Sequence, residues 1–397
     1  MYKIRFKNYN KINKNVDKSI LFCYLILGII GIIFIYSASM VPARMGSLTN
    51  GNIINSNHFM VRQSIFLFVG TLIVLFIAYF VDIDALKAKA FQQFIIIGVI
   101  ILLIITLILG SEINGSKNWL NLGFFSIQSS EFLKLASIIY LSYIIDKKMS
   151  QARIYNIKTL LPPLFMLGFG LVLILVQGDL GGTILNIGII LFILMYSDIK
   201  NIVKIQLFSS ISLPFVIYLI YTLIFDTKNT YRLNRIKVIM EPFKYENGEG
   251  YQLSNSLLAI GNGGVTGQGM VNGIMKLGYL PEPHTDFIFS VLAEEAGLIG
   301  VIAVIALYMY ITFKGIIYAN TTKNNYYKII CIGVVSYLFL QVFINLAGIS
   351  GIIPLTGVTL PLLSYGGSSL LSISVAFGLL LATTKKINME KDLETDK

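Results

Sequence analysis

The stretch Tyr279-Leu-Pro-Glu-Pro-His-Thr-Asp-Phe-Ile-Phe289 runs directly into Ser290-Val-Leu-Ala-Glu-Glu-Ala-Gly-Leu-Ile-Gly300. It places a carboxylate, Asp286, at the mouth of an apolar helix. Glu294 and Glu295 follow about 12–13.5 Å further along, at 1.5 Å per helical residue. Ionisable groups at membrane depth are costly, so these carboxylates are candidates for functional residues.

The composition around this stretch is that of an integral membrane protein. The 397 residues are 55% hydrophobic and only 13% charged, with a mean hydropathy of +0.76, a balance that would leave a soluble domain with an apolar surface. Apolar runs recur that are long enough to cross a hydrocarbon core of about 30 Å. The sequence predicts an all-α polytopic membrane protein with ten transmembrane helices, at residues 19–40, 61–81, 92–110, 131–145, 161–177, 182–198, 203–225, 287–313, 328–347 and 369–384.

Basic residues predict the orientation of these spans. The two tails and the even-numbered connections, counted with the first two residues of the spans that follow those connections, hold 21 of the 31 lysines and arginines, so the positive-inside rule places both termini in the cytoplasm and the chemistry outside. The chain then divides into a basic tail at 1–18, a transmembrane domain at 19–384 with a large extracellular loop at 226–286, and a second cytoplasmic tail at 385–397. The net charge of +11 follows from this topology, and no aromatic-interleaved basic patch points to nucleic acid.

The long outer loop contains a basic part, Tyr231-Arg-Leu-Asn-Arg-Ile-Lys237. Arg232 and Arg235 are three residues apart and would share one face of a helix. Two guanidinium groups on one face suit a diphosphate. An interfacial helix whose basic side chains meet lipid headgroups explains the same spacing.

The loop also contains a glycine part, Gly261-Asn-Gly-Gly-Val-Thr-Gly-Gln-Gly269. It lacks the Lys-Ser/Thr ending of a nucleotide-binding P-loop, which favours a flexible or re-entrant segment that uses the conformational freedom of glycine. We expect no organic cofactor. Cys23 and Cys331 both fall inside predicted spans, so neither a disulfide nor a protein metal cage is expected.

A third outer cluster is Pro354-Leu-Thr-Gly-Val-Thr-Leu-Pro361, followed by Leu362-Leu-Ser-Tyr-Gly-Gly-Ser-Ser369. Its prolines and paired glycines exclude continuous helix, and irregular backbone near membrane depth survives where protein or water satisfies it. The cluster therefore predicts the lining of a cavity. A polar turn in which Ser368 or Ser369 caps the last span is the alternative.

Three further residues have both a functional and a structural explanation. Glu131 and Lys134, at i and i+3 of the fourth predicted span, can pair on one face, either to order a cavity floor or as a buried structural pair. Trp119, the single tryptophan, could stack on a sugar or anchor the chain at the membrane interface. For Asp286, the alternative to an acid–base role is that of a helix N-cap.

Taken together, ordered motifs along nearly the whole chain resemble the SEDS (shape, elongation, division and sporulation) glycosyltransferases, the family of RodA, FtsW and SpoVE. The motifs are Gly115-Ser-Lys-Asn-Trp119, Ser126-Ile-Gln-Ser-Ser-Glu-Phe-Leu-Lys134, Gln177-Gly-Asp-Leu-Gly181, Gly250-Tyr-Gln252, Ala259-Ile-Gly-Asn-Gly-Gly264, Leu280-Pro-Glu-Pro-His-Thr-Asp-Phe-Ile-Phe289 and Ser364-Tyr-Gly-Gly-Ser-Ser369. Tyr231 to Ile236, Lys276 to Pro281 and Thr359 to Pro361 look more like the FtsW and SpoVE branch than like RodA.

The resemblance implies a ten-span polymerase that joins lipid II units into peptidoglycan strands on the outer face of the bacterial plasma membrane, in division or sporulation, and releases undecaprenyl diphosphate. It implies a class B penicillin-binding protein (a transpeptidase) and other division or sporulation membrane proteins as partners, and a divalent metal ion, Mg²⁺ or Mn²⁺, could bridge the substrate diphosphate. The family's catalytic aspartate falls on Asp286. Candidate substrate-binding residues are Arg232, Arg235, Lys276, His284, Trp119, Ser364 and Ser368, and candidate supporting residues are Glu131, Lys134, Asp179, Glu294 and Glu295.

Some positions depart from the family pattern. Gln128-Ser-Ser-Glu131 and Gly178-Asp-Leu-Gly181 each lack the usual proline, and Asn118 replaces an arginine common before the tryptophan. None of these changes removes a carboxylate or Lys134.

Two other functions use the same features. A lipid II flippase or other transporter would also place charges and broken helices in the membrane. A non-catalytic division scaffold would make Asp286 dispensable.

Overall fold

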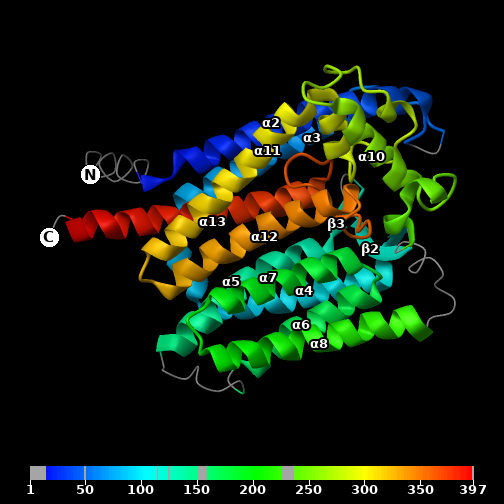
Figure 1. The fold of residues 1–397 in the computed structure, drawn as a ribbon. Helices are drawn as coiled ribbons and strands as arrows, with labels where there is room; N and C mark the ends of the chain where they lie inside the picture. Colours follow the sequence, from blue (N-terminus) through cyan, green and yellow to red (C-terminus); the bar gives the residue numbers. More distant parts are fainter. Residues whose placement is uncertain are drawn as a thin grey trace.

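The structure, a computed structural model, describes residues 15–48, 51–113, 115–123, 126–150, 158, 160–225 and 237–395, and these residues are mostly helical (Figure 1). The N-terminal part forms α2 (Lys18–Met45), α3 (His58–Phe80), the 3₁₀ helix η1 (Ile83–Lys87) and α4 (Lys89–Leu109). The middle forms β1 (Ser111–Ile113), β2 (Ser116–Asn121), β3 (Ser126–Gln128), α5 (Ser129–Ser150), α6 (Leu161–Val176), α7 (Leu180–Tyr196) and α8 (Asn201–Phe225). The C-terminal part forms η3 (Pro242–Tyr245), α10 (Tyr251–Gly263), η4 (Met275–Leu277), α11 (Ile288–Thr321), α12 (Asn325–Ile349) and α13 (Gly367–Thr395).

Each of the ten predicted spans overlaps one of these helices. Six helices, α2, α3, α4, α11, α12 and α13, are long and apolar enough to cross a membrane, and shorter apolar helices occur at Leu161–Val176, Leu180–Tyr196 and Asn201–Ile217. The chain is therefore a multi-pass membrane protein, while the count of ten spans stays a prediction.

Helices α12 and α13 form the centre of the bundle. In their most apolar 18-residue windows, 72% and 83% of the residues are buried, against 22% for α4, whose apolar side chains face outward. Small residues bring α13 close to α3: a Cβ added at Gly378 would lie 2.8 Å from Ile77, and one at Gly70 would lie 2.5 Å from Ser374. Close backbone approach at small residues is how membrane helices gain packing contacts.

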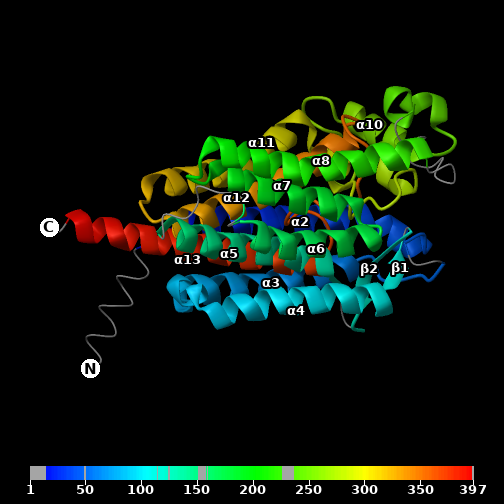
Figure 2. The same cartoon turned by 90° about the horizontal axis from the view of Figure 1, so that it is seen from below.

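The described ends of the chain lie together. In Figures 1 and 2, α2 begins and α13 ends at one end of the bundle, while α10 and the strands lie at the opposite end. The described residues 237–287, with η3, α10 and η4, thus lie at the end away from the described ends of the chain. This separation matches the predicted topology, whose assignment to the two sides of the membrane stays a prediction.

A small antiparallel sheet covers part of that end. The strand order is β1-β2-β3, with Trp119 opposite Gln128 and Leu120 opposite Ile127. The prediction of an all-α fold missed this sheet, because its strands are short and their residues mostly polar. Since β3 leads directly into α5, the sheet fixes where α5 begins.

Helix α11 is interrupted at Gly297, where φ is 63° and ψ is −165°. The residues 264–269, here called the glycine segment, bond to both sides of the break. Amides 268 and 269 donate to the carbonyls of Glu294 and Glu295 at 2.9 and 3.0 Å, and amides 298 and 299 donate to carbonyls 264 and 265 at 3.0 and 3.3 Å. A Cβ at Gly267 would lie 2.1 Å from the Glu295 carbonyl oxygen, so the contact requires glycine there.

Candidate active site

Asp286 lies directly before α11, at the end of the bundle that carries α10. The N-cap of α11 is Phe287, and no side chain caps this helix, so the structure does not support the alternative that Asp286 is a helix cap. Asp286 is partly exposed. Among the described residues, none donates a hydrogen bond to its carboxylate or pairs with it.

The surroundings of Asp286 disfavour its charged form. Burial raises the pKa of this carboxyl to about 6, and the neighbouring Glu282 carboxylate raises it further. Glu282 itself has a left-handed backbone, with φ at 49°, a strain that surrounding structure must hold in place. On the other side, a Cβ at Gly357 would lie 3.7 Å from the Asp286 Oδ2 atom. A poised, unpaired carboxylate of this kind suits a general base near neutral pH.

His284 has a buried ring packed between aromatic side chains. Its centroid lies 4.4 Å from that of Phe59 and 5.5 Å from that of Tyr365, and its carbonyl accepts a hydrogen bond from the Tyr365 amide at 2.9 Å. Burial lowers its pKa to about 4, so the ring is neutral at pH 7. Its Nδ1 atom has no hydrogen-bond partner among the described residues. These contacts fit loop packing or orientation better than proton transfer.

Two serines of the third cluster accept hydrogen bonds from main-chain amides. Ser364 Oγ accepts from the Leu360 amide at 2.7 Å, and Ser368 Oγ accepts from the Gln128 amide at 3.1 Å, which ties β3 to α13. Both side chains are buried. Ser364 thus holds the turn and Ser368 holds β3 against α13, while their substrate contact and the alternative in which Ser368 or Ser369 caps the last span stay predictions.

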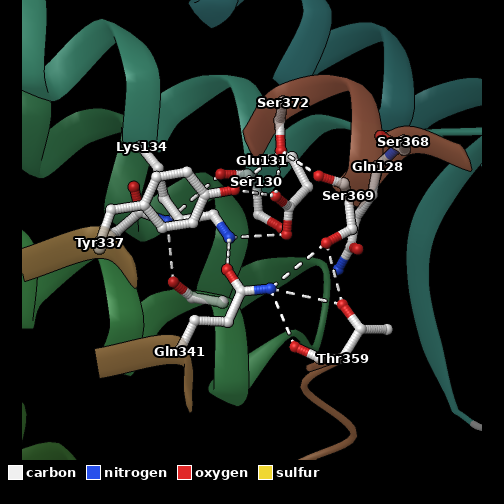
Figure 3. A network of polar contacts seen from close by, with 12 residues as sticks. Gln128, Ser130, Glu131, Lys134, Tyr337, Gln341, Thr359, Ser368, Ser369 and Ser372 are labelled. Atoms are coloured by element: carbon white, nitrogen blue, oxygen red, sulfur yellow. Dashed lines mark hydrogen bonds and ion pairs between the residues drawn. The ribbon is translucent and has the colours of Figure 1, made fainter. Parts of the chain in front are cut away.

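A buried polar network joins α5, α12 and α13 beside this turn (Figure 3). The Lys134 ammonium lies 2.6 Å from Glu131 Oε1 and donates to Gln341 Oε1 at 3.0 Å. The hydroxyls of Tyr337 and Ser372 donate to Glu131 Oε2 at 2.7 and 2.6 Å. The structure thus pairs Glu131 with Lys134, and their exposed fractions of 5% and 1% place the pair in low dielectric.

Gln341 extends this network to the turn. Its amide Nε2 donates to the Thr359 carbonyl at 3.0 Å and lies 3.3 Å from Ser369 Oγ. In Figure 3 the Gln341 amide stands between Lys134 on one side and Thr359 with Ser369 on the other. The sequence analysis missed Tyr337 and Gln341, because a tyrosine and a glutamine in an apolar span carry no signal of their own.

Asp179 acts as a structural anchor next to the network. Its Oδ1 accepts from the Gly182 amide at 2.7 Å, which makes it the N-cap of α7. Its Oδ2 accepts from Ser130 Oγ at 2.8 Å and from Gln128 Nε2 at 3.0 Å. These bonds join the start of α5 to the start of α7.

Lys276 differs from its prediction. Its ammonium is fully buried, pairs with Glu295 at 2.5 Å and donates to Ser37 Oγ at 2.8 Å. A lysine whose charge is already matched inside the protein is not placed to meet a diphosphate from outside, so the predicted direct contact does not fit this geometry. Glu294 Oε1 accepts the amides of Ile274 and Met275 at 3.0 and 3.3 Å. Both glutamates therefore hold the segment that precedes Asp286.

Two adjoining cavities lie near the start of α10, and α10 itself lines only the second. The first, of about 340 Å³, is lined by residues that include Lys237 and Lys244. The second, of about 290 Å³, lies between α10 and the segments that carry Pro281 and Leu355. The two lysines are cations that the sequence analysis did not single out, although Lys237 ends the basic part of the long loop.

The remaining predicted residues have less defined roles. Arg232 and Arg235 lie outside the described residues. Trp119 is half-buried in β2, and its carbonyl accepts from Ser111 Oγ at 3.1 Å. Within the described part of the chain, no group of three His, Cys, Asp or Glu side chains could hold a metal ion, so no chemical step is assigned to one.

Comparisons with known proteins identify the family of this chain. The sequence profile of the FtsW, RodA and SpoVE family, described as cell cycle protein, matches residues 17–389. The chain belongs to this family. Among its FtsW-like relatives is a probable peptidoglycan glycosyltransferase FtsW of Bacillus subtilis (strain 168), which is 36% identical over 93% of this chain and 91% of that protein. A protein of the same name from Coxiella burnetii is 32% identical over 93% and 96%.

Solved structures of the family share the fold. A chain from a study entitled "Structural coordination of polymerization and crosslinking by a peptidoglycan synthase complex" superposes with a TM-score of 0.72 at 23% identity, over 94% of this chain and 98% of that one. The rod shape determining protein RodA of Thermus thermophilus superposes with a TM-score of 0.63 at 22% identity, over 94% and 97%.

Proposed function

We propose that the protein is a peptidoglycan glycosyltransferase that polymerises lipid II into glycan strands at the outer face of the plasma membrane, with Asp286 as general base. The observation that carries the proposal is the Asp286 carboxylate, which has no partner among the described residues and whose pKa burial raises to about 6. The FtsW relatives of the chain are named probable peptidoglycan glycosyltransferases. The FtsW names support division or sporulation over elongation.

In this reaction Asp286 takes the proton from the acceptor hydroxyl while that oxygen bonds to the anomeric carbon of the donor sugar. The bond from that carbon to the lipid diphosphate oxygen breaks, and its electron pair leaves with the diphosphate. General-base catalysis of this kind contributes roughly 100- to 10,000-fold. Ionised Asp286 prevails above about pH 6, which is where a plasma-membrane enzyme at neutral pH needs it.

The leaving diphosphate needs cations. Lys237 and Lys244 line the first cavity together with Glu249, and Lys244, which pairs with Glu241, is mostly exposed and can reach a ligand from outside. Arg232 and Arg235 lie just upstream of Lys237 in the chain. A Mg²⁺ or Mn²⁺ ion carried by the diphosphate would add charge neutralisation there.

The topology is part of the proposal. Ten spans with both termini cytoplasmic would put Asp286 and α10 outside, because α10 and the described ends of the chain lie at opposite ends of the bundle (Figure 1). A class B penicillin-binding protein is the proposed transpeptidase partner, supported by the fold shared with a chain of a peptidoglycan synthase complex. Its action would crosslink the strands made here.

The test is polymerisation of purified lipid II by the protein in detergent, alone and with such a partner. Asp286→Asn keeps the side-chain size but removes the basic oxygen, so polymer should fall at least about 100-fold while lipid II binding persists. His284→Ala should be milder, and Glu282→Gln serves as the matched control for loss of a nearby carboxylate. Near wild-type polymerisation by Asp286→Asn with an inactive His284→Ala would move the base to the histidine.

The same experiment separates the other functions. A flippase would yield no covalent product in detergent, and a scaffold would make Asp286→Asn harmless to cells in which the assembly is intact.

A further inference from the structure

Asn345 of α12 holds the main chain of the proposed base. Its Nδ2 donates to the Asp286 carbonyl at 3.0 Å and to the Val358 carbonyl at 2.8 Å. The side chain is 4% exposed, and its own Oδ1 has no partner among the described residues. One carboxamide thus uses both of its N–H groups to fasten the start of α11 to the turn before α13.

This contact matters because Asp286 has little else to hold it. Among the described residues, its carboxylate has neither a hydrogen-bond donor nor an ion pair, so the place of the side chain depends on its packing and on the position of its backbone. That backbone is bonded through Asn345 to Val358, next to Gly357, above which the Asp286 Oδ2 atom lies. The glycine leaves room in front of the carboxylate.

A second carboxamide on the same face of α12 holds the turn at Thr359, the residue after Val358. Gln341, one turn before Asn345 on α12, donates to the carbonyl of Thr359 at 3.0 Å (Figure 3). Residues 358 and 359 are therefore held by two amides four positions apart, which lie on one face of a helix. The Lys134 ammonium in turn orients Gln341 through its Oε1 atom.

From this geometry we infer that Asn345 is the positioning residue of the base, a role that rests on the proposed function. By bonding both the Asp286 and the Val358 carbonyls, it sets the distance of the Asp286 carboxylate from the turn and keeps it in its half-buried place. Asn345 does not touch the reacting atoms. Its loss leaves the base present but displaced, and displacement of about 1 Å can cost on the order of 100-fold in rate.

The experiment measures lipid II polymerisation against pH for the purified full chain. Asn345→Ala should lower kcat by about 10- to 100-fold and change KM by less than about twofold. The pH below which the rate of Asn345→Ala falls, here called the acid limb, should also be lower than in the wild type. The reason is that a loosened segment lets water reach the Asp286 carboxyl, whose pKa burial raises to about 6 in the wild-type structure. Among the described residues, the Glu282 carboxylate also raises the pKa of Asp286, so the pH profile of Glu282→Gln is measured as the reference for a shift of that pKa.

Asn186 of α7 provides a matched control. It is also buried, its Nδ2 donates to two carbonyls, those of Ser130 at 3.3 Å and Gly182 at 2.8 Å, and its Oδ1 is also unpartnered among the described residues. Asn186→Ala should lower the melting temperature much as Asn345→Ala does, yet leave the acid limb unchanged. A structural role alone would give both variants the same pH profile.

Asn345→Ser stays polar but is too short to repeat both contacts, so it should fall between wild type and alanine and decides the question if Asn345→Ala does not fold. The positioning role would be overturned if the folded Asn345 variants kept the wild-type kcat and acid limb. If Asp286→Asn were inactive in the same assay, the proposed function would still stand. Absence of polymerisation by the wild-type protein would overturn both.

Discussion

Removal of the Lys134 side chain is the sharpest test of the buried network. In the wild-type structure its ammonium contacts Glu131 Oε1 at 2.6 Å, Gln341 Oε1 at 3.0 Å and the Tyr337 ring at 4.3 Å from the centroid. Lys134→Ala removes all three contacts at a site where both charges are almost fully buried. The Glu131 carboxylate would keep only its hydroxyl donors, Tyr337 and Ser372, on Oε2.

The cost follows from these contacts. Breaking a buried pair costs about 3–5 kcal/mol, and the two remaining hydroxyl donors keep the loss near the lower end. An unpaired Gln341 carbonyl adds roughly 1 kcal/mol or more, so we expect a loss of about 4 kcal/mol in the free energy of unfolding. The double variant Lys134→Ala with Glu131→Gln removes the uncompensated charge and should recover about half of it.

The assay is thermal unfolding of the purified protein in one detergent. Lys244 and Glu241 offer a matched control, because they form a pair with the same i,i+3 spacing and the same 2.6 Å distance, but with side chains 65% and 55% exposed. Lys244→Ala should leave the melting temperature unchanged, since solvent screens such a pair. Equal melting of Lys134→Ala and Lys244→Ala would refute the argument from burial.

Other predictions concern the base, the second buried pair and the topology. Because the folded pKa of Asp286 is raised to about 6, the base is protonated below that pH, and polymerisation should fall about tenfold per pH unit there; a flat rate down to about pH 5 would contradict this. Glu295→Gln leaves Lys276 buried without its counter-charge and should cost about 3–5 kcal/mol, so unchanged thermal unfolding would exclude a stabilising pair. In intact cells, Asn262→Cys should react with an impermeant thiol reagent and Lys391→Cys should not, and the opposite pattern would reverse the proposed orientation.

The helices of this fold were predictable because membrane helices are apolar along their length. The ends of the helices were less predictable. The last span was predicted to end at residue 384, yet α13 continues to Thr395. The reason lies in distant partners: Lys385 Nζ donates to the Ala78 carbonyl at 2.6 Å, and Lys386 pairs with Asp82 at 2.9 Å. These contacts hold the basic residues in the helix and against the bundle, whereas hydropathy alone indicated that the helix ends and a tail begins there.

The sequence predicted the charged residues of the site, because a charge stands out in an apolar segment. Asp286, Glu131 and Lys134 are conspicuous for that reason. The sequence did not predict the neutral amides, which do not stand out. Gln341 and Asn345 are as buried as the core residues Leu338 and Ile344 of α12. Their partners lie far along the chain or in irregular turns. The burial of Lys276 was missed for a related reason, because its partner Glu295 comes 19 residues later, across segments whose folding a local pattern does not describe.

The break in α11 at Gly297 has a consequence for chain length. The two halves of this helix are aligned by four main-chain hydrogen bonds to the glycine segment, which lies outside the helix. One residue inserted between positions 265 and 268 would shift those bonds out of phase and turn one half of α11 relative to the other. The length of this segment is therefore as constrained as that of a helical turn, and its side chains can change only where the backbone does not require glycine, as it does at Gly267.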